Sequence, residues 1–184
     1  MPKTIPRSAA PEWVRDRLTG RSGTCWVGID GFGAAGKTTL AAEVAAALPG
    51  SVVVSVDHFG RAGLRGWDRE LFTAQVLQPL LAGRAGCYQH WDLLTDTGGD
   101  WVEVPSGVPV IVEGVSATDV RVAVPWDVTL WLDVPADVRW QRITGRDDAD
   151  LLERWRTDWL PSEQAYAAAQ DPMARADALI EPGT

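Results

Sequence analysis

Residues 24–40 read TCWVGIDGFGAAGKTTL, and this stretch decides the fold. It opens on a short apolar run, Thr24 to Asp30, which is typical of a buried strand in a parallel sheet. A glycine-rich turn follows. From Thr38 to Leu48 a leucine or valine recurs every four positions among alanines, which predicts a helix that Pro49 and Gly50 close. The order is therefore strand, glycine turn, helix.

The glycine turn, Gly31 to Thr38 (GFGAAGKT), is a full match to the phosphate-binding pattern GxxxxGK[ST]. Small residues let backbone N–H groups surround a phosphate, and the following helix directs its positive dipole end at the same charge. We expect Lys37 to reach the β- and γ-phosphates, the Thr38 hydroxyl to bind Mg²⁺, and Thr39 to contact the α-phosphate. The alternative is a glycine-rich turn that contains Lys-Thr by chance. The predicted nucleotide-binding residues are Gly31, Gly33, Ala34, Ala35, Gly36, Lys37, Thr38 and Thr39.

Strand-like and helical patterns alternate along the rest of the chain, which predicts an α/β fold with a mostly parallel sheet. A β-branched run at residues 51–56 completes a βαβ unit with the first strand. Further strands are expected at 108–112, 128–132 and 178–180, and helices at 11–18, 69–81, 135–144, 151–159 and 162–169.

Residues 87–104 predict an antiparallel hairpin, because the segments CYQHWDLL and WVEV flank the turn-like TDTGGD. We therefore expect one α/β domain over residues 1–184, with a five-stranded sheet and helices on both faces. Its parts are a helical leader at 1–23, the hairpin insertion at 85–104 and a lid region at 139–150.

The composition excludes several other classes. Lys and Arg total 17 against 25 for Asp and Glu, a net charge of −8 that disfavours unspecific binding to nucleic acid or an anionic membrane. Cys25 and Cys87 form no metal-ligand spacing, so we interpret them as free thiols of a reducing compartment. No stretch approaches the ~20 apolar residues of a membrane span. We expect a soluble cytoplasmic protein, and the oligomeric state stays open, a homo-oligomer included.

Two carboxylates follow apolar runs at predicted strand ends, where ligands of parallel α/β sheets bind. Asp57 follows VVVSV and Glu113 follows VPVIV. A hydroxyl that attacks a phosphate needs a proton acceptor, and Mg²⁺ needs carboxylate partners. We assign Asp57 as the base and Glu113 to the metal, with exchanged or shared roles left open, so the predicted metal residues are Thr38, Asp57 and Glu113. The alternative is that each carboxylate caps the following helix.

Three arginines lie three and four residues apart on a predicted helix: Arg139, Arg142 and Arg146. At this spacing they share one side of the helix, where like charges repel unless an anion lies among them. The functional interpretation is a lid that neutralises a transferring phosphoryl group, with Arg142 and Arg146 as the better catalytic candidates. The alternative is a solvated face balanced by the neighbouring aspartates.

With these motifs placed, the chain from Thr24 to Ile180 resembles the uridine kinase group of P-loop nucleoside kinases, a family related to phosphoribulokinase and pantothenate kinase. GFGAAGKT matches its phosphate loop, VSVDHF its segment with a catalytic aspartate, VIVEG its acidic strand end, and DVPADVRWQRITGRD its arginine lid. The resemblance implies a three-layer P-loop NTPase fold that uses ATP and Mg²⁺.

The same resemblance implies contacts to the substrate. Trp67-Asp68 resembles an aromatic-Asp pair that holds sugar hydroxyls, and LLAGRAGCY leads to a substrate-contacting tyrosine, here Tyr88. In YQHWDLLTD a leucine stands where the family has a base-contacting histidine, so His90, Asp92 or Trp91 are alternatives, and the lid after residue 147 is shortened. The predicted substrate residues are Asp68, Tyr88, Asp92, Glu113 and Arg139.

These features lead us to expect an ATP-dependent, Mg²⁺-requiring kinase that phosphorylates a hydroxyl of a small molecule, with a nucleoside as the first candidate. Pantothenate, a sugar, or an aminosugar-like metabolite or drug would keep the same mechanism. A nucleotide-dependent switch or ATPase is another class, but the sequence has no NKxD tetrad and no apolar run that ends in Asp-Glu. A third class is a module that binds a nucleotide but catalyses no reaction.

Overall fold

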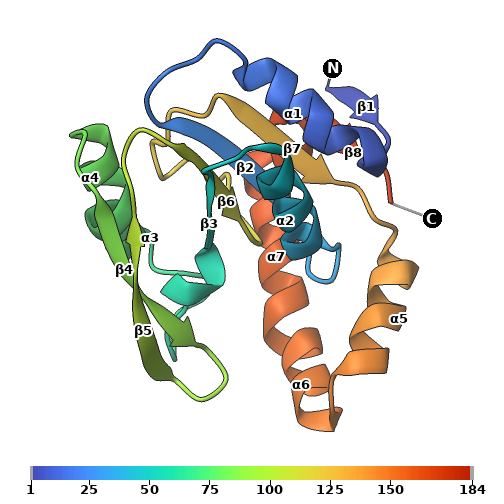
Figure 1. Ribbon diagram of the computed structural model, residues 1–184. Coiled ribbons are helices and arrows are strands. Elements are labelled where there is room, and N and C mark those ends of the chain that lie inside the picture. The colour runs from blue at the N-terminus through green and yellow to red at the C-terminus, as the bar shows by residue number, and fades with distance from the viewer. Residues whose placement is uncertain (1, 183–184) are drawn as a thin grey trace.

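The computed structural model describes residues 2–182, so residues 1, 183 and 184 of the predicted domain lie outside it. Its centre is a six-stranded sheet in which every pairing is parallel, in the order β1-β8-β7-β2-β6-β3 (Figure 1). The strands are β1 (Lys3–Ile5), β2 (Cys25–Gly31), β3 (Val52–Ser55), β6 (Pro109–Glu113), β7 (Val128–Leu132) and β8 (Ala178–Ile180).

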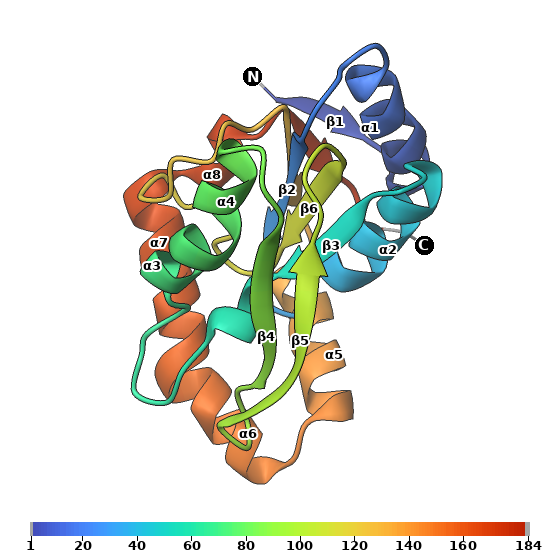
Figure 2. The same ribbon diagram turned by 60° about the vertical axis from the view of Figure 1, so that its left-hand side comes forward.

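Helices cover both faces of the sheet (Figures 1 and 2). On one face, α1 (Ala10–Leu18) and α2 (Lys37–Ala47) bury an apolar cluster against β2, β7 and β8. The opposite face carries a second cluster, to which the 69–81 segment and the hairpin contribute. The remaining helices are η1 (Arg7–Ala9), η2 (Val56–Phe59), α3 (Arg69–Phe72), η3 (Thr73–Leu77), α4 (Gln78–Leu81), α5 (Ala136–Arg146), α6 (Ala149–Arg154), η4 (Trp155–Trp159), α7 (Leu160–Gln170) and α8 (Pro172–Arg175).

The strand-turn-helix order predicted at 24–48 is present. Strand β2 is buried at all its positions, which agrees with a central strand covered on both faces. It pairs with β6 on one side and β7 on the other, so the glycine turn that follows it lies at the middle of the sheet's carboxyl edge. Two helices predicted at 151–159 and 162–169 form one run, α6, η4 and α7, with a π-helical turn at Trp155–Trp159.

The sheet has one strand more than the sequence predicted. Strand β1 is three residues long and pairs with β8, at Lys3 with Ala178 and Ile5 with Ile180. Only Ile5 of the three is buried. Three residues are too few to show a strand-like alternation of polar and apolar side chains. The segment is a strand because it pairs with β8, which lies near the other end of the chain, and a local pattern could not predict that pairing.

The hairpin is formed by β4 (Gly86–Asp92) and β5 (Thr97–Val104), and its turn differs from the predicted one. We expected TDTGGD to form the turn, but Thr97 to Asp100 belong to β5 and the turn occupies residues 93–96. The Asp92 carboxylate accepts from the N–H groups of Leu94 and Thr95, and Asp96 has a positive φ of 51°. An Asx turn therefore reverses the chain earlier than the glycine pair would.

Within residues 2–182, no helix combines the length and the apolar character needed to cross a bilayer.

Candidate active site

The phosphate-binding loop, Gly31 to Thr38, joins β2 to α2 and is held in an unusual backbone conformation. Gly36 caps α2 with φ 93°, a left-handed value that favours glycine. Ala34 is also left-handed, with φ 59°, which costs about 1 kcal/mol for a residue with a Cβ. Lys37, which is buried, donates from Nζ to the Phe32 carbonyl at 2.9 Å. The first N–H groups of α2 lack partners within their own helix, as in every helix, and can receive an anion.

Arginines bind the carbonyl groups of this loop. Arg142 of α5 donates from Nη1 to the carbonyls of Ala34 and Ala35, at 3.0 and 3.3 Å. Arg7 of η1 donates to the carbonyl of Gly36 at 3.4 Å and also pairs with Glu43 of α2. Residues of η1 and α5, which are distant from the loop in sequence, therefore stabilise the strained turn at Ala34.

A buried carboxylate, Glu163 of α7, also contacts the loop. Both of its oxygens accept from the Gly33 N–H, at 3.0 and 3.1 Å. A Cβ on Gly33 would lie 2.4 Å from the Trp155 ring and 2.7 Å from a Glu163 oxygen. Gly33 therefore must be glycine because the α6–α7 run packs against it, rather than only to admit a phosphate as the motif suggested.

At the carboxyl ends of β3 and β6 the structure brings the two predicted carboxylates to the loop. The Thr38 hydroxyl donates to Glu113 Oε1 at 3.3 Å. Burial raises the pKa of Glu113, while the Ser55 and Thr38 hydroxyls and the Lys37 charge lower it and the neighbouring Asp57 charge raises it. Asp57 is exposed at the start of η2. Lys37, Thr38, Asp57 and Glu113 thus form one cluster. The alternative of helix capping does not hold for Asp57, because the side chain that caps η2 is Ser55, and Glu113 accepts from Thr38 instead.

The donor set of this cluster fits Mg²⁺. A hydroxyl and carboxylates are hard oxygen ligands, and Mg²⁺ in proteins is usually held by one or two carboxylates together with phosphate oxygens and water. Thr38 and Glu113 are the residues that would hold it, with Asp57 on the open side. Among the described residues, no group of three or more His, Cys, Asp or Glu side chains is arranged as a metal cage.

The three predicted lid arginines share α5 but have different partners. Arg139 is buried, donates to the Val134 carbonyl at 3.1 Å and lies over the Phe32 ring at 4.6 Å. Burial lowers its pKa and Glu163 opposes that shift. Arg142 binds the loop, as described above. Arg146 pairs with Asp147 at 2.6 Å, and its side chain is 62% exposed. Arg142 therefore binds the loop backbone and Arg139 contacts its Phe32 ring, whereas Arg146 is paired with Asp147.

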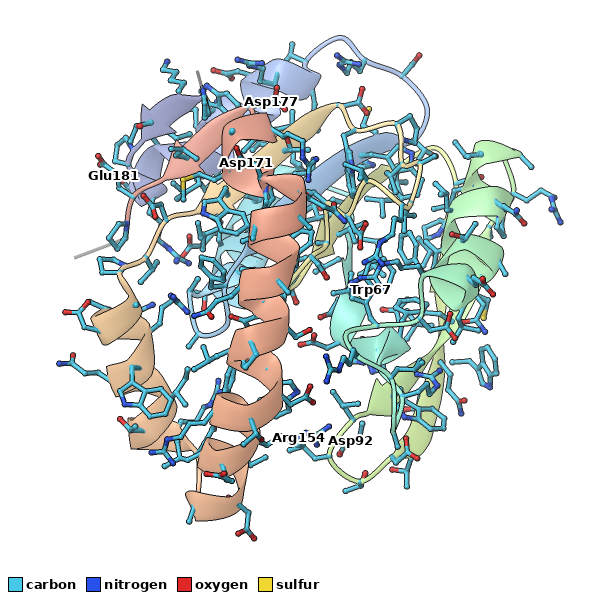
Figure 3. The ribbon with its side chains drawn as sticks, turned by 180° about the vertical axis from the view of Figure 1, so that it is seen from behind. Trp67, Asp92, Arg154, Asp171, Asp177 and Glu181 are labelled. Atoms are coloured by element: carbon cyan, nitrogen blue, oxygen red, sulfur yellow. The ribbon has the colours of Figure 1, made fainter. Side chains whose placement is uncertain are left out.

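The predicted substrate residues lie on the segment and the hairpin beyond Asp57. Asp68 caps α3 by accepting from the Leu71 N–H at 2.9 Å, a structural role that the sequence analysis did not predict for it. Tyr88 is buried, and burial raises its pKa to about 12. Asp92 is exposed at the outer end of β4, at the same end of the molecule as Arg154 of α6 (Figure 3). Its hydrogen bonds are to its own turn.

Histidines and aromatic rings connect the hairpin to the Asp57 segment. The rings of His58 and His90 are stacked with centroids 4.1 Å apart, and both lie 5.9 Å from the Tyr88 ring. His58 Nδ1 lies 3.3 Å from the Trp91 carbonyl. The hairpin is thus packed against His58, the residue that follows the predicted base Asp57.

Two buried aspartates were missed as organising residues. Asp30, just before the loop, accepts from Gly31 N, Ser116 N, Thr118 and Tyr166, with the Tyr166 hydroxyl at 2.6 Å. Asp119 is fully buried and accepts from Arg69, Arg121 and Gln170. Asp30 is a charged residue at the end of the apolar run TCWVGID, and this position could have indicated a structural role for it. The sequence around Asp119 and Glu163 contains no comparable feature.

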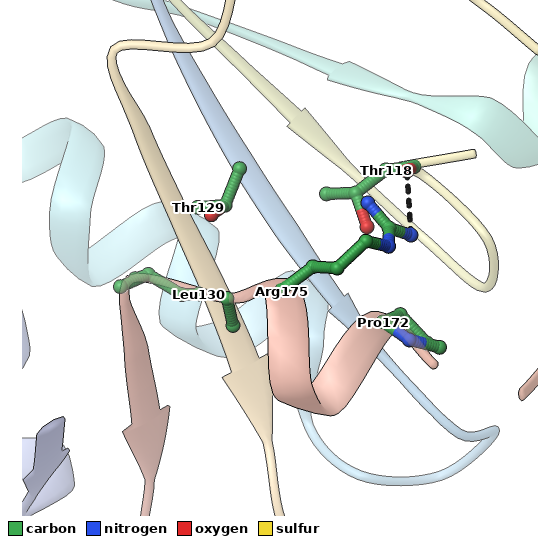
Figure 4. A pocket seen from close by; sticks show the side chains of 6 residues that line it. Thr118, Thr129, Leu130, Pro172 and Arg175 are labelled. Atoms are coloured by element: carbon green, nitrogen blue, oxygen red, sulfur yellow. Dashed lines mark hydrogen bonds between the residues drawn. The ribbon is translucent and has the colours of Figure 1, made fainter. Parts of the chain in front are cut away.

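Two hollows elsewhere in the molecule are separate from this cluster. A cavity of about 10 Å³ lies beside β7, and one of the residues that line it, Arg175, donates to the Thr118 carbonyl at 3.3 Å (Figure 4). It can hold at most a single water. A groove of about 320 Å³ is lined by residues of α1, the 19–25 segment, the end of α2 and residues 107 and 109. Neither contains a residue of the phosphate-binding loop.

Comparison with known proteins supports the fold. No protein-family model matches the chain, and no curated protein sequence matches it. Among solved structures, a "Possible Uridine Kinase" from Bacillus stearothermophilus is 20% identical with a TM-score of 0.70, over 94% of this chain and 98% of that chain. A "putative fructose transport system kinase" from Silicibacter sp. TM1040 is 23% identical with a TM-score of 0.74, over 95% and 98%. At these identities the likeness concerns the fold, and the chain has the P-loop kinase-like α/β fold that the sequence predicted.

Proposed function

We propose that this protein is a kinase that transfers the γ-phosphoryl group of ATP to a hydroxyl of a small molecule. The observation that carries the proposal is the cluster of Lys37, Thr38 and Glu113 at the phosphate-binding loop with Asp57 beside it. A pure nucleotide-binding module needs the loop but has no need of two carboxylates at the adjacent strand ends.

The roles follow from chemistry and position. The loop amides and Lys37 bind the phosphates, for which Lys37 must leave the Phe32 carbonyl that it now binds. Asp57 accepts the proton of the attacking hydroxyl, and its exposure leaves it open to an acceptor. Mg²⁺, when bound at Thr38 and Glu113, would neutralise charge on the β- and γ-phosphates. Arg142 is already beside the loop, whereas Arg146 would have to release Asp147 to contribute.

Residues of the hairpin and the Asp57 segment support a ring-shaped, hydroxylated acceptor. The stacked rings of His58 and His90 present aromatic surface next to the predicted base, and the buried Tyr88 ring lies 5.9 Å from each of them. We take a nucleoside as the first candidate, because aromatic side chains stack on bases. A sugar is the second, since one structural neighbour is described as a fructose transport system kinase. Pantothenate or an aminosugar-like compound would use the same transfer chemistry.

The test is a screen of pooled nucleosides, sugars and other hydroxylated metabolites with ATP and Mg²⁺, read by mass spectrometry. The proposal expects one acceptor class to gain the mass of a phosphoryl group, with ADP formed in equal amount. ADP formation that is independent of every acceptor would support a hydrolase or switch. An absence of both ADP formation and nucleotide binding would contradict the proposal.

A further inference from the structure

The phosphate-binding loop has one amide that a side chain already occupies. The Glu163 carboxylate, on α7, receives the Gly33 N–H on both oxygens at 3.0 and 3.1 Å, across 130 residues of sequence. Glu163 is 5% exposed. In this structure the Gly33 N–H is bound by Glu163, so Glu163 contacts the loop backbone directly and can influence the shape of the loop.

The charge of this carboxylate is balanced by neighbours that belong to the same site. Burial raises the pKa of Glu163, and the Gly33 N–H together with the positive charges of Lys37 and Arg139 opposes that shift. An isolated buried carboxylate would be strongly unfavourable, so the surrounding donor and cations are needed to retain it. Glu163 is therefore part of the loop's polar surroundings rather than an incidental surface group.

Packing reinforces the contact. The Trp155 ring of η4 lies so close to Gly33 that a Cβ there would be 2.4 Å from it. Trp155 in turn donates from Nε1 to Asp147 at 2.7 Å, at the end of α5. The α6–α7 run thus contacts the loop at Gly33 through the Trp155 ring and the Glu163 carboxylate, directly before the strained Ala34.

We propose that Glu163 is a positioning residue of the phosphate-binding loop, whose acceptor oxygens fix the turn at Gly33 and Ala34 in the form that binds nucleotide. This inference rests on the proposed function, because it assumes that the loop receives the phosphates of ATP. It assigns Glu163 no contact with the substrate. The property that matters is the hydrogen-bond acceptor next to Gly33 N–H, so a side chain that keeps the acceptor without the charge should retain the function.

The experiment compares Glu163→Gln with Glu163→Met, which have similar volume but differ in the acceptor. Binding of Mg-ATP is measured by calorimetry, and the melting temperature is measured on the same preparations. Glu153→Gln is the control, since Glu153 is on α6 with a side chain that is 67% exposed. If E163M does not fold, Glu163→Ala replaces it under the same criterion.

The expected result is that E163M weakens Mg-ATP binding at least about tenfold, while E163Q and the control stay within about threefold of wild type. A merely structural role would lower the melting temperature of E163M and leave the affinity of the folded protein unchanged, which would overturn the inference. Equal weakening by E163Q and E163M would also overturn it. Absence of Mg-ATP binding by the wild-type protein would contradict the proposed function as well, so the two failures are distinguishable.

Discussion

The hydroxyl of Thr38 and the carboxylate of Glu113 are joined by a 3.3 Å hydrogen bond although 75 residues separate them in the sequence. The bond links the start of α2 to the end of β6, which are the two elements that carry the phosphate-binding loop and the acidic strand end. It forms because β6 is the direct neighbour of β2 in the sheet, with Ile29 opposite Glu113. Sheet order therefore creates the cluster on which the proposed reaction depends.

The role of Asp57 as the base predicts a separation between binding and transfer. Asp57→Asn keeps the side-chain shape and removes the proton acceptor, so phosphoryl transfer should fall at least about 100-fold, within the range of general-base contributions. Binding of Mg-ATP should change less than about threefold, because Asp57 lies on the open side of the cluster. The measurements are calorimetry and an acceptor-dependent transfer assay. A parallel loss of affinity would mean that Asp57 is mainly a metal ligand.

The close approach at Gly33 predicts a steric coupling. Gly33→Ala places a Cβ 2.4 Å from the Trp155 ring, so it should destabilise the protein by about 1–3 kcal/mol. Gly145→Ala is the matched control, because a Cβ there meets nothing within 4 Å and alanine favours the helix.

Trp155→Ala removes the obstructing ring, at the expense of a cavity. The free energy of unfolding is measured with denaturant for Gly33→Ala, for Trp155→Ala and for the double variant. The loss of stability in the double variant should be smaller than the sum of the two single losses by about 1 kcal/mol or more. Simple additivity would mean that the ring and the glycine do not meet in solution.

The buried hub at Asp119 predicts a large loss of stability. Asp119→Ala leaves Arg69 and Gln170 without their acceptor inside the protein, so it should cost about 3 kcal/mol or more. At this chain length that corresponds to a decrease of about 6–12 °C in melting temperature. Asp16→Ala, at a side chain that is 68% exposed, should change stability by less than about 0.5 kcal/mol. Similar melting temperatures for the two variants would contradict the assignment of Asp119 as a hub.

The stacked histidines predict an acid-sensitive hairpin. Burial, together with the His58 charge, lowers the pKa of His90, and Asp100 partly opposes the shift. The pKa of such a histidine is lower in the folded protein than in the unfolded chain. Its contribution to stability is therefore present above the unfolded pKa and is lost as the pH falls through the folded pKa. His90→Phe keeps a ring for stacking and cannot charge.

Melting curves recorded from about pH 8 down to about pH 5.5 check this prediction. The melting temperature of the wild-type protein should fall relative to that of His90→Phe as the pH decreases. A difference in melting temperature between the two proteins that stays constant over this pH range would contradict the prediction, because it would mean that protonation of His90 does not affect stability.

Sequence patterns predicted the sheet strands from β2 onward because each is a continuous apolar run bounded by turn residues. They also predicted the loop and both strand-end carboxylates, since the loop has a local motif and the carboxylates directly follow apolar runs. They failed at β1, where a polar segment is a strand only because β8 is beside it. They also misplaced the hairpin turn, where Asp92 and Asp96 determine the chain reversal ahead of the glycines.

Glu163 shows why part of the site was inaccessible to sequence analysis. Its helix was predicted, but the glutamate follows Pro161 and Ser162 and no motif marks it. Which side of α7 faces Gly33 depends on how the whole helix crosses the sheet, and Tyr166 bonding to Asp30 fixes that placement. Similarly, the arginine spacing predicted a shared helix face, while the partner of each guanidinium depends on loops that the spacing does not describe.

The most direct test of the account is calorimetric titration of Mg-ATP into the wild-type protein and into Lys37→Ala. We predict binding by the wild-type protein and a loss of at least about tenfold in affinity for the variant, because Lys37 supplies the charge that meets the β- and γ-phosphates. The variant should keep its melting temperature within a few degrees. Equal affinities in the two proteins, or no binding by the wild-type protein, would contradict the assignment of Gly31 to Thr38 as a nucleotide site.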